Sequence, residues 1–213
     1  MSVLNNKVAR HCYKRAMPRV VDPAERRQKI FEAVFDVVVR SGIEQVTLRA
    51  VADAAGLAIG SVRHYFPSRD ELIGAASNEI IDRVSARIES HRERLSDRAD
   101  RLAVVEDMLC ELLPLTEHTT REVTVWLEIV TSGRTDSVLA AAAGRLFEGS
   151  SSLARLVVVR ARLGAESESD LETERLAAMM DGLALRATLH PDQLSSAVAR
   201  KVVRRHLTQL REM

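Results

Sequence analysis

Apolar residues recur every three to four positions along most of the chain, while strict alternation of apolar and polar residues is almost absent. The first spacing places side chains on one face of an α-helix, and alternation is the mark of a half-buried strand. Only 9 Gly and 5 Pro interrupt the pattern over 213 residues. The sequence therefore predicts an all-α protein of about nine helices.

The first predicted helix spans residues 23–41. Asp22 is a favourable N-cap, and Pro23 suits the first helical position because its missing N–H would have no intrahelical partner there. Gly42 follows as a stop signal. Between these limits, the apolar residues at helical spacing are Ile30, Ala33, Val34 and Val37.

Two short helices follow, over residues 48–55 and 59–66. Thr47 is a suitable cap for the first, Gly56 tolerates the left-handed turn at its end, and Pro67 ends the second. The connection between them is too short for a long antiparallel hairpin, so the second helix crosses the first steeply and projects from the surface. A longer helix followed by two such helices is typical of a helix-turn-helix DNA-binding unit.

Helical spacing continues through the rest of the chain. A capping sequence at 68–71 opens a fourth helix that reaches about residue 95. A polar loop is expected at 164–169. The remaining helices are expected at about 102–112, 123–132, 136–163, 170–188 and 192–210.

Composition and charge narrow the functional classes. Hydrophobic residues make up 46% of the chain, and no run of 18 apolar residues or secretory leader is recognised, so a soluble cytoplasmic protein that enters no membrane is expected. Residues 1–75 carry 12 Lys/Arg against 8 Asp/Glu, while the remainder carries 19 against 22. A basic N-terminal part suits contact with phosphates, although chance variation in solvated charge would also give this asymmetry.

Three stretches within residues 23–72 form a specific pattern. They are Thr47-Leu48-Arg49-Ala50-Val51-Ala52, Ala55-Gly56-Leu57 and Gly60-Ser61-Val62-Arg63-His64-Tyr65-Phe66-Pro67-Ser68-Arg69. In these stretches the chain resembles the tetracycline-repressor family of bacterial transcriptional regulators. The resemblance implies a helix-turn-helix DNA-binding domain at 22–67 and an effector-binding and dimerisation domain at 68–213.

The resemblance also implies a function. A repressor of this family is expected to bind double-stranded operator DNA as a homodimer and to leave it when a small-molecule effector binds the larger domain. The alternative is a helical ligand-binding or adaptor protein without DNA binding, which would lack salt-dependent affinity for DNA.

The recognition helix implied at 59–66 carries hydroxyl, guanidinium, imidazole and phenol groups, which suit phosphate oxygens and base edges. Three residues keep two interpretations each: Thr47 caps a helix or binds a phosphate, Arg69 binds a phosphate or a surface carboxylate, and Ile59 touches a thymine methyl or packs inward. The predicted DNA-contacting residues are Thr47, Arg49, Ile59, Gly60, Ser61, Arg63, His64, Tyr65 and Arg69.

Two features limit how far the family pattern can be transferred. Ala58, Ile59 and Arg63 depart from the commonest family pattern, so the operator sequence does not follow from relatives. The segment 1–21 is expected to be a flexible basic arm because it carries five Lys/Arg. This arm either enters a minor groove or has no role in binding DNA.

Apolar stripes mark the last two helices, which the resemblance assigns to the dimer interface. The alternative is that these stripes pack only within one subunit. The predicted interface residues are Leu176, Met179, Met180, Leu183, Ala187, Leu194, Val198 and Val202.

The resemblance places an effector cavity among the middle helices. Only Trp126 and Phe147 are aromatic after residue 75, so an aliphatic or acyl-like effector is favoured over a planar cation in an aromatic cage. The predicted cavity residues are Met108, Leu112, His118, Arg121, Trp126, Ile129, Phe147 and Met179.

An enzyme is the main competing class. The sequence has no nucleophile elbow, no His-Glu-x-x-His motif, no phosphate-binding glycine loop and no paired Cys ligands. Cys12 and Cys110 are far apart and fit no metal spacing. Neither a catalytic activity nor a metal or cofactor is therefore expected.

Overall fold

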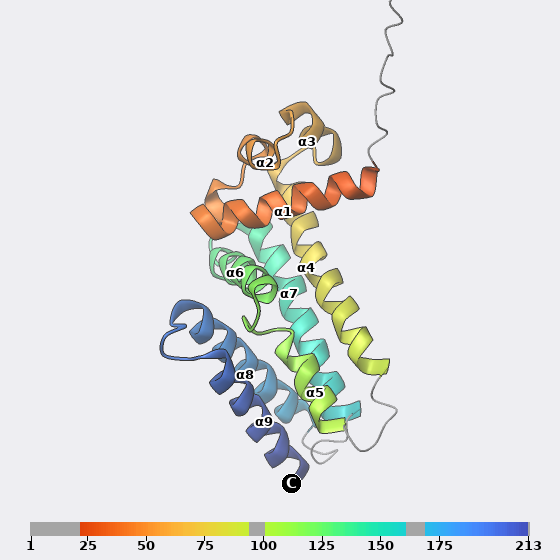
Figure 1. Ribbon diagram of the computed structural model, residues 1–213, viewed down its shortest axis with the longest axis vertical. Helices are drawn as coiled ribbons and strands as arrows, with labels where there is room; N and C mark the ends of the chain where they lie inside the picture. Colours follow the sequence, from red (N-terminus) through yellow and green to blue (C-terminus); the bar gives the residue numbers. More distant parts are fainter. Residues whose placement is uncertain (1–21, 94–100, 161–168, 213) are drawn as a thin grey trace, which may run out of the picture.

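The computed structural model describes residues 22–93, 101–160 and 169–212 (Figure 1). These ranges hold nine α-helices and no strand, which confirms the predicted all-α class. The predicted basic arm at 1–21 lies outside the described residues, as does most of the loop expected at 164–169.

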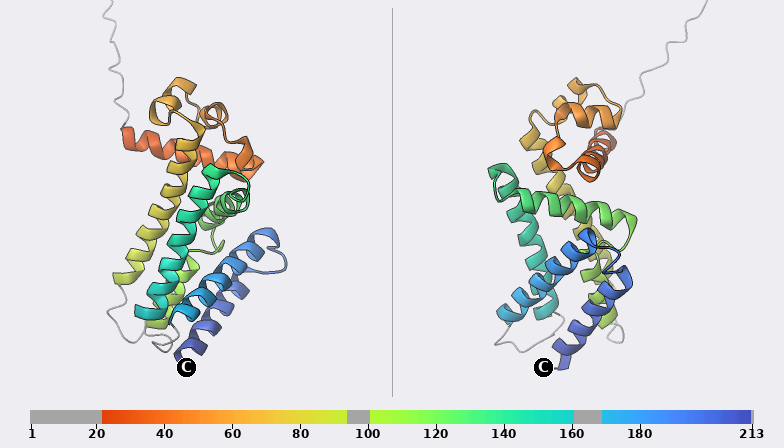
Figure 2. Two further views of the ribbon diagram at one scale, coloured as in Figure 1. Left: turned by 180° about the vertical axis from the view of Figure 1, so that it is seen from behind. Right: turned by 90° about the vertical axis from the view of Figure 1, so that its left-hand side faces the viewer.

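Three helices build a head at one end of the molecule (Figures 1 and 2). They are α1 (Pro23–Ser41), α2 (Leu48–Ala55) and α3 (Ile59–Tyr65). A carboxylate oxygen of Asp22 accepts the N–H of Ala24 at 2.9 Å, and the hydroxyl of Thr47 accepts the N–H of Ala50 at 3.0 Å. Both N-caps were predicted because these side chains satisfy N–H groups that the first helical turn leaves free.

Gly56 ends α2 in the left-handed conformation, with φ of 62°. Residues with a Cβ pay a steric cost there, so the glycine permits the tight turn into α3. The helix-turn-helix geometry expected from the sequence is therefore present.

Six helices form the rest of the described chain. They are α4 (Arg69–Arg92), α5 (Arg101–Cys110), α6 (Glu117–Ser132), α7 (Ser137–Arg155), α8 (Ser169–Leu189) and α9 (Ser196–Glu212). A π-helical segment, Leu156–Arg160, continues α7. The last helix begins at residue 196 rather than 192, because the chain turns after His190 before Ser195 caps α9.

Two clusters of buried apolar side chains hold the fold together. The first joins the head to α4, α6 and α7, so the core that begins around Ile30 and Phe35 extends to Ile129 and Leu146. The second cluster surrounds Leu109 and contains side chains from each of the helices α5, α6, α7, α8 and α9. Each fully buried Leu, Ile or Phe contributes roughly 1.5–3 kcal/mol to folding. The head is thus packed onto the body by a shared core.

Candidate nucleic-acid interface and ligand cavity

The recognition helix α3 lies at the outer end of the head (Figure 1). Two apolar side chains anchor it: Val62 is fully buried, and Phe66, which follows the helix, is also buried. The ring centres of Phe66 and Phe31 lie 5.5 Å apart, and the guanidinium of Arg27 lies 5.0 Å from the centre of the Phe66 ring. These contacts fix one face of α3 and leave the opposite face to solvent.

The outer face of α3 carries the predicted DNA-contacting side chains. Arg63 and His64 are exposed, and Ile59 is 43% exposed, so its inward-packing alternative is wrong. Ser61 and Tyr65 are half-buried, and Thr47 and Arg49 of the preceding helix are exposed. A Cβ built on Gly60 would meet no atom within 4 Å. The open space beside Gly60 leaves room for the close approach of another molecule.

Arg69 is placed differently from its predicted contact with a phosphate. Its Nε donates to the carbonyl oxygen of Val46 at 2.9 Å and its Nη2 to that of Ile43 at 3.2 Å. Its Nη1 also lies 3.7 Å from the Asp136 carboxylate. These carbonyls belong to the turn before α2 and need partners when buried, so Arg69 stabilises the head from within.

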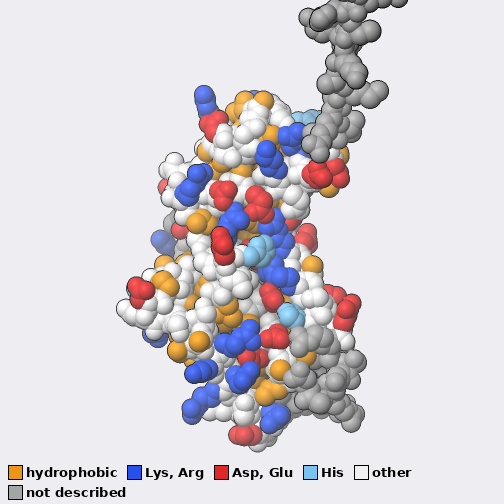
Figure 3. Space-filling model, viewed as in Figure 1, with side chains coloured by type: hydrophobic (Ala, Val, Ile, Leu, Met, Phe, Trp, Pro, Cys, Tyr) orange, Lys and Arg blue, Asp and Glu red, His pale blue; other side chains and the backbone are white. Residues whose placement is uncertain are grey.

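Ion pairs cross the junction between head and body, where acidic and basic side chains intermingle (Figure 3). Arg121 of α6 binds Glu32 at 2.9 Å and Asp36 at 2.7 Å, both on α1. Arg83 of α4 binds Glu32 at 2.7 Å. Partial burial alone raises the pKa of Glu32, but hydrogen bonds and positive charge from Arg83 and Arg121 outweigh it and lower the pKa. The junction therefore contains matched charges.

A second link across the junction uses the backbone. A carboxylate oxygen of Glu128 on α6 accepts the N–H of Ile43 at 3.0 Å. Ile43 opens the short turn between α1 and α2, so α6 contacts both α1 and the turn that positions the helix-turn-helix.

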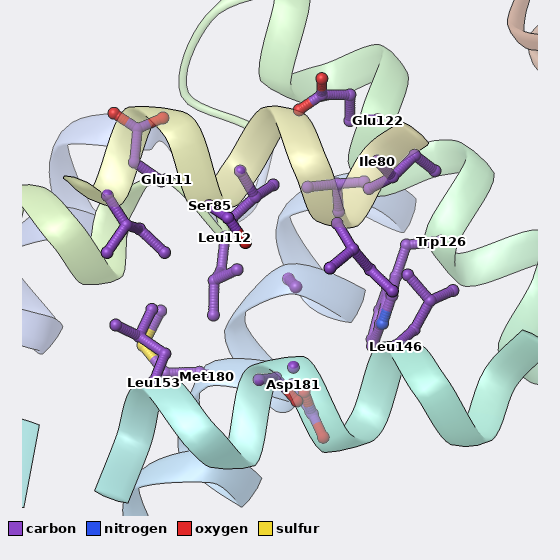
Figure 4. A pocket seen from close by; sticks show the side chains of 17 residues that line it. Ile80, Ser85, Glu111, Leu112, Glu122, Trp126, Leu146, Leu153, Met180 and Asp181 are labelled. Carbon is purple, nitrogen blue, oxygen red and sulfur yellow. The ribbon is translucent and has the colours of Figure 1, made fainter. Parts of the chain in front are cut away.

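The body contains a cavity of about 90 Å³ between α4, the end of α5, α6, α7 and α8 (Figure 4). Its walls are mainly apolar, with Ile80, Val84, Leu112, Trp126, Leu153 and Met180 among them. Ser85 of α4 and Gly149 of α7 also line it and are exposed, so the cavity reaches the surface between these helices.

Three carboxylates line the cavity, and two of them are paired. Glu111 accepts from Arg87 at 2.7 Å and lies 2.9 Å from Nε2 of His91. Glu122 accepts from Arg87 at 2.6 Å and lies 3.0 Å from Nε2 of His118. Arg87 thus holds both glutamates against α4.

The third carboxylate, Asp181 of α8, has no hydrogen bond or ion pair with the residues that the structure describes. Burial raises its pKa above the ordinary value of 3.8. This shift follows because burial disfavours the charged form of an acid and no neighbouring cation compensates. The cavity therefore combines apolar walls with one unpaired acidic group.

Comparison with known proteins places the chain in a family. Residues 101–212 match the family model of the BetI-type transcriptional repressor C-terminal domain, and residues 30–76 match that of bacterial regulatory proteins of the tetR family. The HTH-type transcriptional regulator PksA of Bacillus subtilis (strain 168) is 32% identical over 195 residues, which cover 91% of this chain and 94% of the relative. The chain belongs to the TetR family of transcriptional regulators.

Other relatives agree over the same length. The HTH-type transcriptional regulator BetI 2 of Chromohalobacter salexigens is 28% identical over 197 residues, covering 91% of this chain and 92% of the relative. The crystal structure of a transcriptional regulator from Rhodococcus sp. Rha1 is 25% identical, with a TM-score of 0.74, and covers 87% of this chain and 96% of that one. The protein is therefore a DNA-binding transcriptional regulator, and the adaptor alternative is not supported.

Two of the eight predicted effector residues, Leu112 and Trp126, line the cavity. Met108 and Ile129 are buried in the two apolar clusters, and Met179 packs against the second. Phe147 is exposed and meets Trp126 edge to face at 6.4 Å. His118 and Arg121 form the ion pairs described above, so these six residues do not belong to the lining of this cavity.

Sequence reasoning missed Asp181 and Met180 as cavity residues. Both lie on α8, which the family resemblance assigned to the dimer interface. An acidic residue beside its apolar stripe, one position after Met180, was the available signal.

The predicted dimer stripe on α8 faces the interior of the same subunit. Leu176, Met180, Leu183 and Ala187 are buried there, because α8 covers α6 and α7. The exposed apolar side chains of the last two helices lie elsewhere on their surface, where hydrophobic and basic side chains alternate (Figure 3). They are Leu171, Leu185 and Leu189 of α8 and Val198 and Val202 of α9.

Within the described ranges, every helix is too short or too polar to traverse a lipid bilayer. The same ranges contain no group of three His, Cys, Asp or Glu side chains suited to a metal ion.

Proposed function

We propose that this regulator is a homodimeric repressor that a small-molecule effector releases from its operator. The observation that carries the proposal is the placement of α3: its apolar side is locked into the head, and its polar side chains face solvent at the end of the molecule. Such a helix can enter a major groove without rearrangement of the head. The protein would act in the cytoplasm, where bacterial operator DNA is found.

We assign three kinds of contact to the outer face of the helix-turn-helix. Arg63 and His64 donate to base edges or phosphates, and Ile59 offers an apolar surface for a thymine methyl. Thr47 uses its oxygen to cap α2, so its O–H remains able to donate to a phosphate. Arg49, Gly60, Ser61 and Tyr65 complete the surface, and Arg69 is left out of it because its guanidinium binds backbone carbonyls.

A second copy of the chain would pair through the exposed faces of α8 and α9. The side chains of Leu189, Val198 and Val202 are 56%, 46% and 37% exposed. Covering this apolar surface with a partner subunit would remove it from water and lower the free energy. Half-buried Met179 and Leu194 border these faces. Pairing on this side would set the two recognition helices at a fixed spacing for a pseudopalindromic site.

The effector would occupy the cavity, whose walls are parts of the helices that carry the head. α4 begins at the turn that follows α3 and lines the cavity about three turns farther on, from Ile80. On α6, Glu122 lines the cavity while the adjacent Arg121 binds α1. A ligand that separates these helices would favour a head position that no longer fits the operator.

A mobility-shift titration with the DNA upstream of the protein's own gene tests the proposal. Wild-type protein should bind, and its affinity should fall steeply as salt rises because phosphate contacts release counterions. Arg63→Ala should bind roughly 5- to 150-fold more weakly, equivalent to about 1–3 kcal/mol for a base contact. Arg211→Ala, which removes the same charge at the far end of α9, is the matched control and should bind like wild type. Equal affinities for all three proteins would remove α3 from the DNA interface.

A further inference from the structure

Within the proposed function, we propose that the effector is a small aliphatic amine in its protonated form, whose ammonium N–H groups donate to the carboxylate of Asp181. The inference rests on the cavity and on the pairing of the charged groups around it. It identifies both the class of ligand and the residue that recognises it.

Asp181 is the one cavity carboxylate that lacks a partner among the described residues. The carboxylates of Glu111 and Glu122 already accept hydrogen bonds from Arg87, at 2.7 Å and 2.6 Å. Asp181 projects from α8 beside Met180, on the side of the cavity away from Glu111 and Glu122 (Figure 4). A ligand that donates to Asp181 would therefore gain a charge-assisted hydrogen bond without breaking an existing ion pair.

The remaining walls define the rest of the ligand. Ile80, Val84, Leu153 and Met180 offer apolar surface that an alkyl chain would cover. The cavity volume is about 90 Å³, so the ligand is small. These walls agree with the aliphatic effector that was expected from the sequence.

Charge decides the head group. The charged residues that line the cavity are Glu111, Glu122 and Asp181, and all three are acidic. The carboxylate of an acyl ligand would approach them with no cation on the lining to receive it, which like-charge repulsion opposes. An acyl-like head is therefore disfavoured, and a cationic head is favoured.

Hydrogen-bond donation separates a protonated amine from a quaternary ammonium ion. Trp126 is the one aromatic residue that lines the cavity, so the several aromatic faces of a quaternary-ammonium cage are not present on this lining. An unpaired carboxylate accepts N–H bonds, which a quaternary ion cannot supply. A primary ammonium group satisfies Asp181 better.

Calorimetric titration of the DNA-free protein with four probes tests this inference. Butylammonium, 1-butanol and butanoate share a four-carbon chain and differ in head charge, and tetramethylammonium carries the same charge as butylammonium without an N–H. Butylammonium should bind at least about 10-fold more tightly than each of the other three. Equal or tighter binding of butanol or butanoate would overturn the cationic head, and equal binding of tetramethylammonium would overturn N–H donation. No binding of butylammonium would overturn the whole assignment.

The Asp181→Asn variant tests whether Asp181 is the residue that accepts the ammonium group. This variant should lose the preference for butylammonium over butanol, while Asp192→Asn, which changes an exposed carboxylate between α8 and α9, should keep it. An Asp181→Asn protein that keeps the preference would place the ammonium elsewhere. The four-probe comparison on the wild type remains decisive even if the variant does not fold.

Failure of this inference and failure of the proposed function give different results. DNA binding without ligand is measured in the mobility-shift titration and does not depend on Asp181. An intact DNA affinity with no response to amines would reject the ligand class alone. Amine binding in a protein that does not bind DNA would reject the repressor function and leave the site in place.

Discussion

The recognition helix and the cavity both present polar side chains that have no hydrogen-bond or ion-pair partner among the described residues, but the energetic cost differs between the two places. Arg63 and His64 on α3 stand in water, which solvates them fully. Asp181 stands in a largely apolar cavity, and burial raises its pKa because the charged form loses hydration there. Polar side chains on the surface of α3 are therefore recognised as candidate binding groups by their exposure and position. The cavity carboxylate is recognised by its burial and its raised pKa.

The two regions also differ in how they are tied to the fold. α3 is anchored by Val62 and Phe66, with half-buried Tyr65 packed against the same core, and its outer face is exposed. The cavity is lined by five segments, and three of them, α4, α6 and α7, share the apolar core that joins the body to the head. A change at the cavity can therefore reach the head through these helices.

The largest expected effect comes from a matched pair of substitutions on α8. Leu183→Arg should destabilise the protein by several kcal/mol, since it places a charge among the buried side chains. Leu189→Arg should leave folding intact and split the dimer, because this side chain is exposed in the subunit. Urea unfolding and size-exclusion chromatography measure the two effects. A folded Leu183→Arg monomer would mean that α8 does not pack as described.

The next effect concerns the junction between the two regions. Arg121→Met removes the ion pairs to Glu32 and Asp36 and keeps most of the apolar length of the side chain. Stability should fall by about 1 kcal/mol, the upper range for partly exposed pairs. Butylammonium should change the operator affinity of this variant less than that of wild type, because α6 has lost its ion pairs with α1. An unchanged ratio of the affinities with and without butylammonium would assign the coupling to α4.

A smaller effect of opposite sign is expected for Asp181→Asn. The raised pKa means that the folded protein binds this proton more strongly than the unfolded chain, so the favourable contribution is full at acidic pH and is lost as pH rises through the raised pKa. At neutral pH the asparagine should therefore stabilise the protein, by no more than about 1 kcal/mol because the site is partly solvated.

Thermal unfolding of Asp181→Asn at several pH values measures this effect. The melting temperature should exceed that of wild type near neutral pH by a few degrees at most, since about 1 kcal/mol shifts the melting temperature of a chain this long by roughly 2–4 °C. The difference should shrink as the solution is acidified. A less stable variant at neutral pH would show that Asp181 has a partner in solution.

The smallest effect is expected at His206, a buried histidine of α9 whose Nε2 lacks a partner among the described residues. Burial, together with the positive charge of Arg175, outweighs Glu172 and lowers the His206 pKa below its ordinary value of 6.5. Its contribution to stability is therefore present above pH 6.5 and is lost as pH falls through the lowered pKa. His206→Gln should unfold with less dependence on pH in this range. An equal dependence in both proteins would assign the acid sensitivity to other groups.

The head was predictable because its signals are local. Asp22, Thr47 and Gly56 each act within a few residues of their own position, as caps or as a left-handed turn, and the structure places all three as expected. The outward face of α3 followed from the same logic, since Val62 and Phe66 lie four residues apart and share the buried side.

Arg69 shows where local reasoning ends. Its position in the first turn of α4 suggested a contact with a phosphate or with a surface carboxylate. The structure has a carboxylate nearby, that of Asp136, but the carbonyls of Ile43 and Val46 lie within reach of Arg69 only after the chain has folded. The same limit applies to Leu183 of α8, which is buried within its own subunit. An apolar stripe indicates that one face of a helix is covered, but it does not indicate which part of the protein covers it.

The sequence by itself determined the helices, their caps and the head, because the interactions that specify them join residues close together in the chain. Tertiary structure alone decided which α8 side chains face the cavity, which are buried in the core and which stay exposed, and which charges find partners. Glu32 and Arg121, or Arg87 and Glu122, are separated by dozens of residues, and their contact depends on how whole helices pack. Asp181 became a candidate for ligand recognition only because that packing leaves it without a partner in the part of the chain that the structure describes.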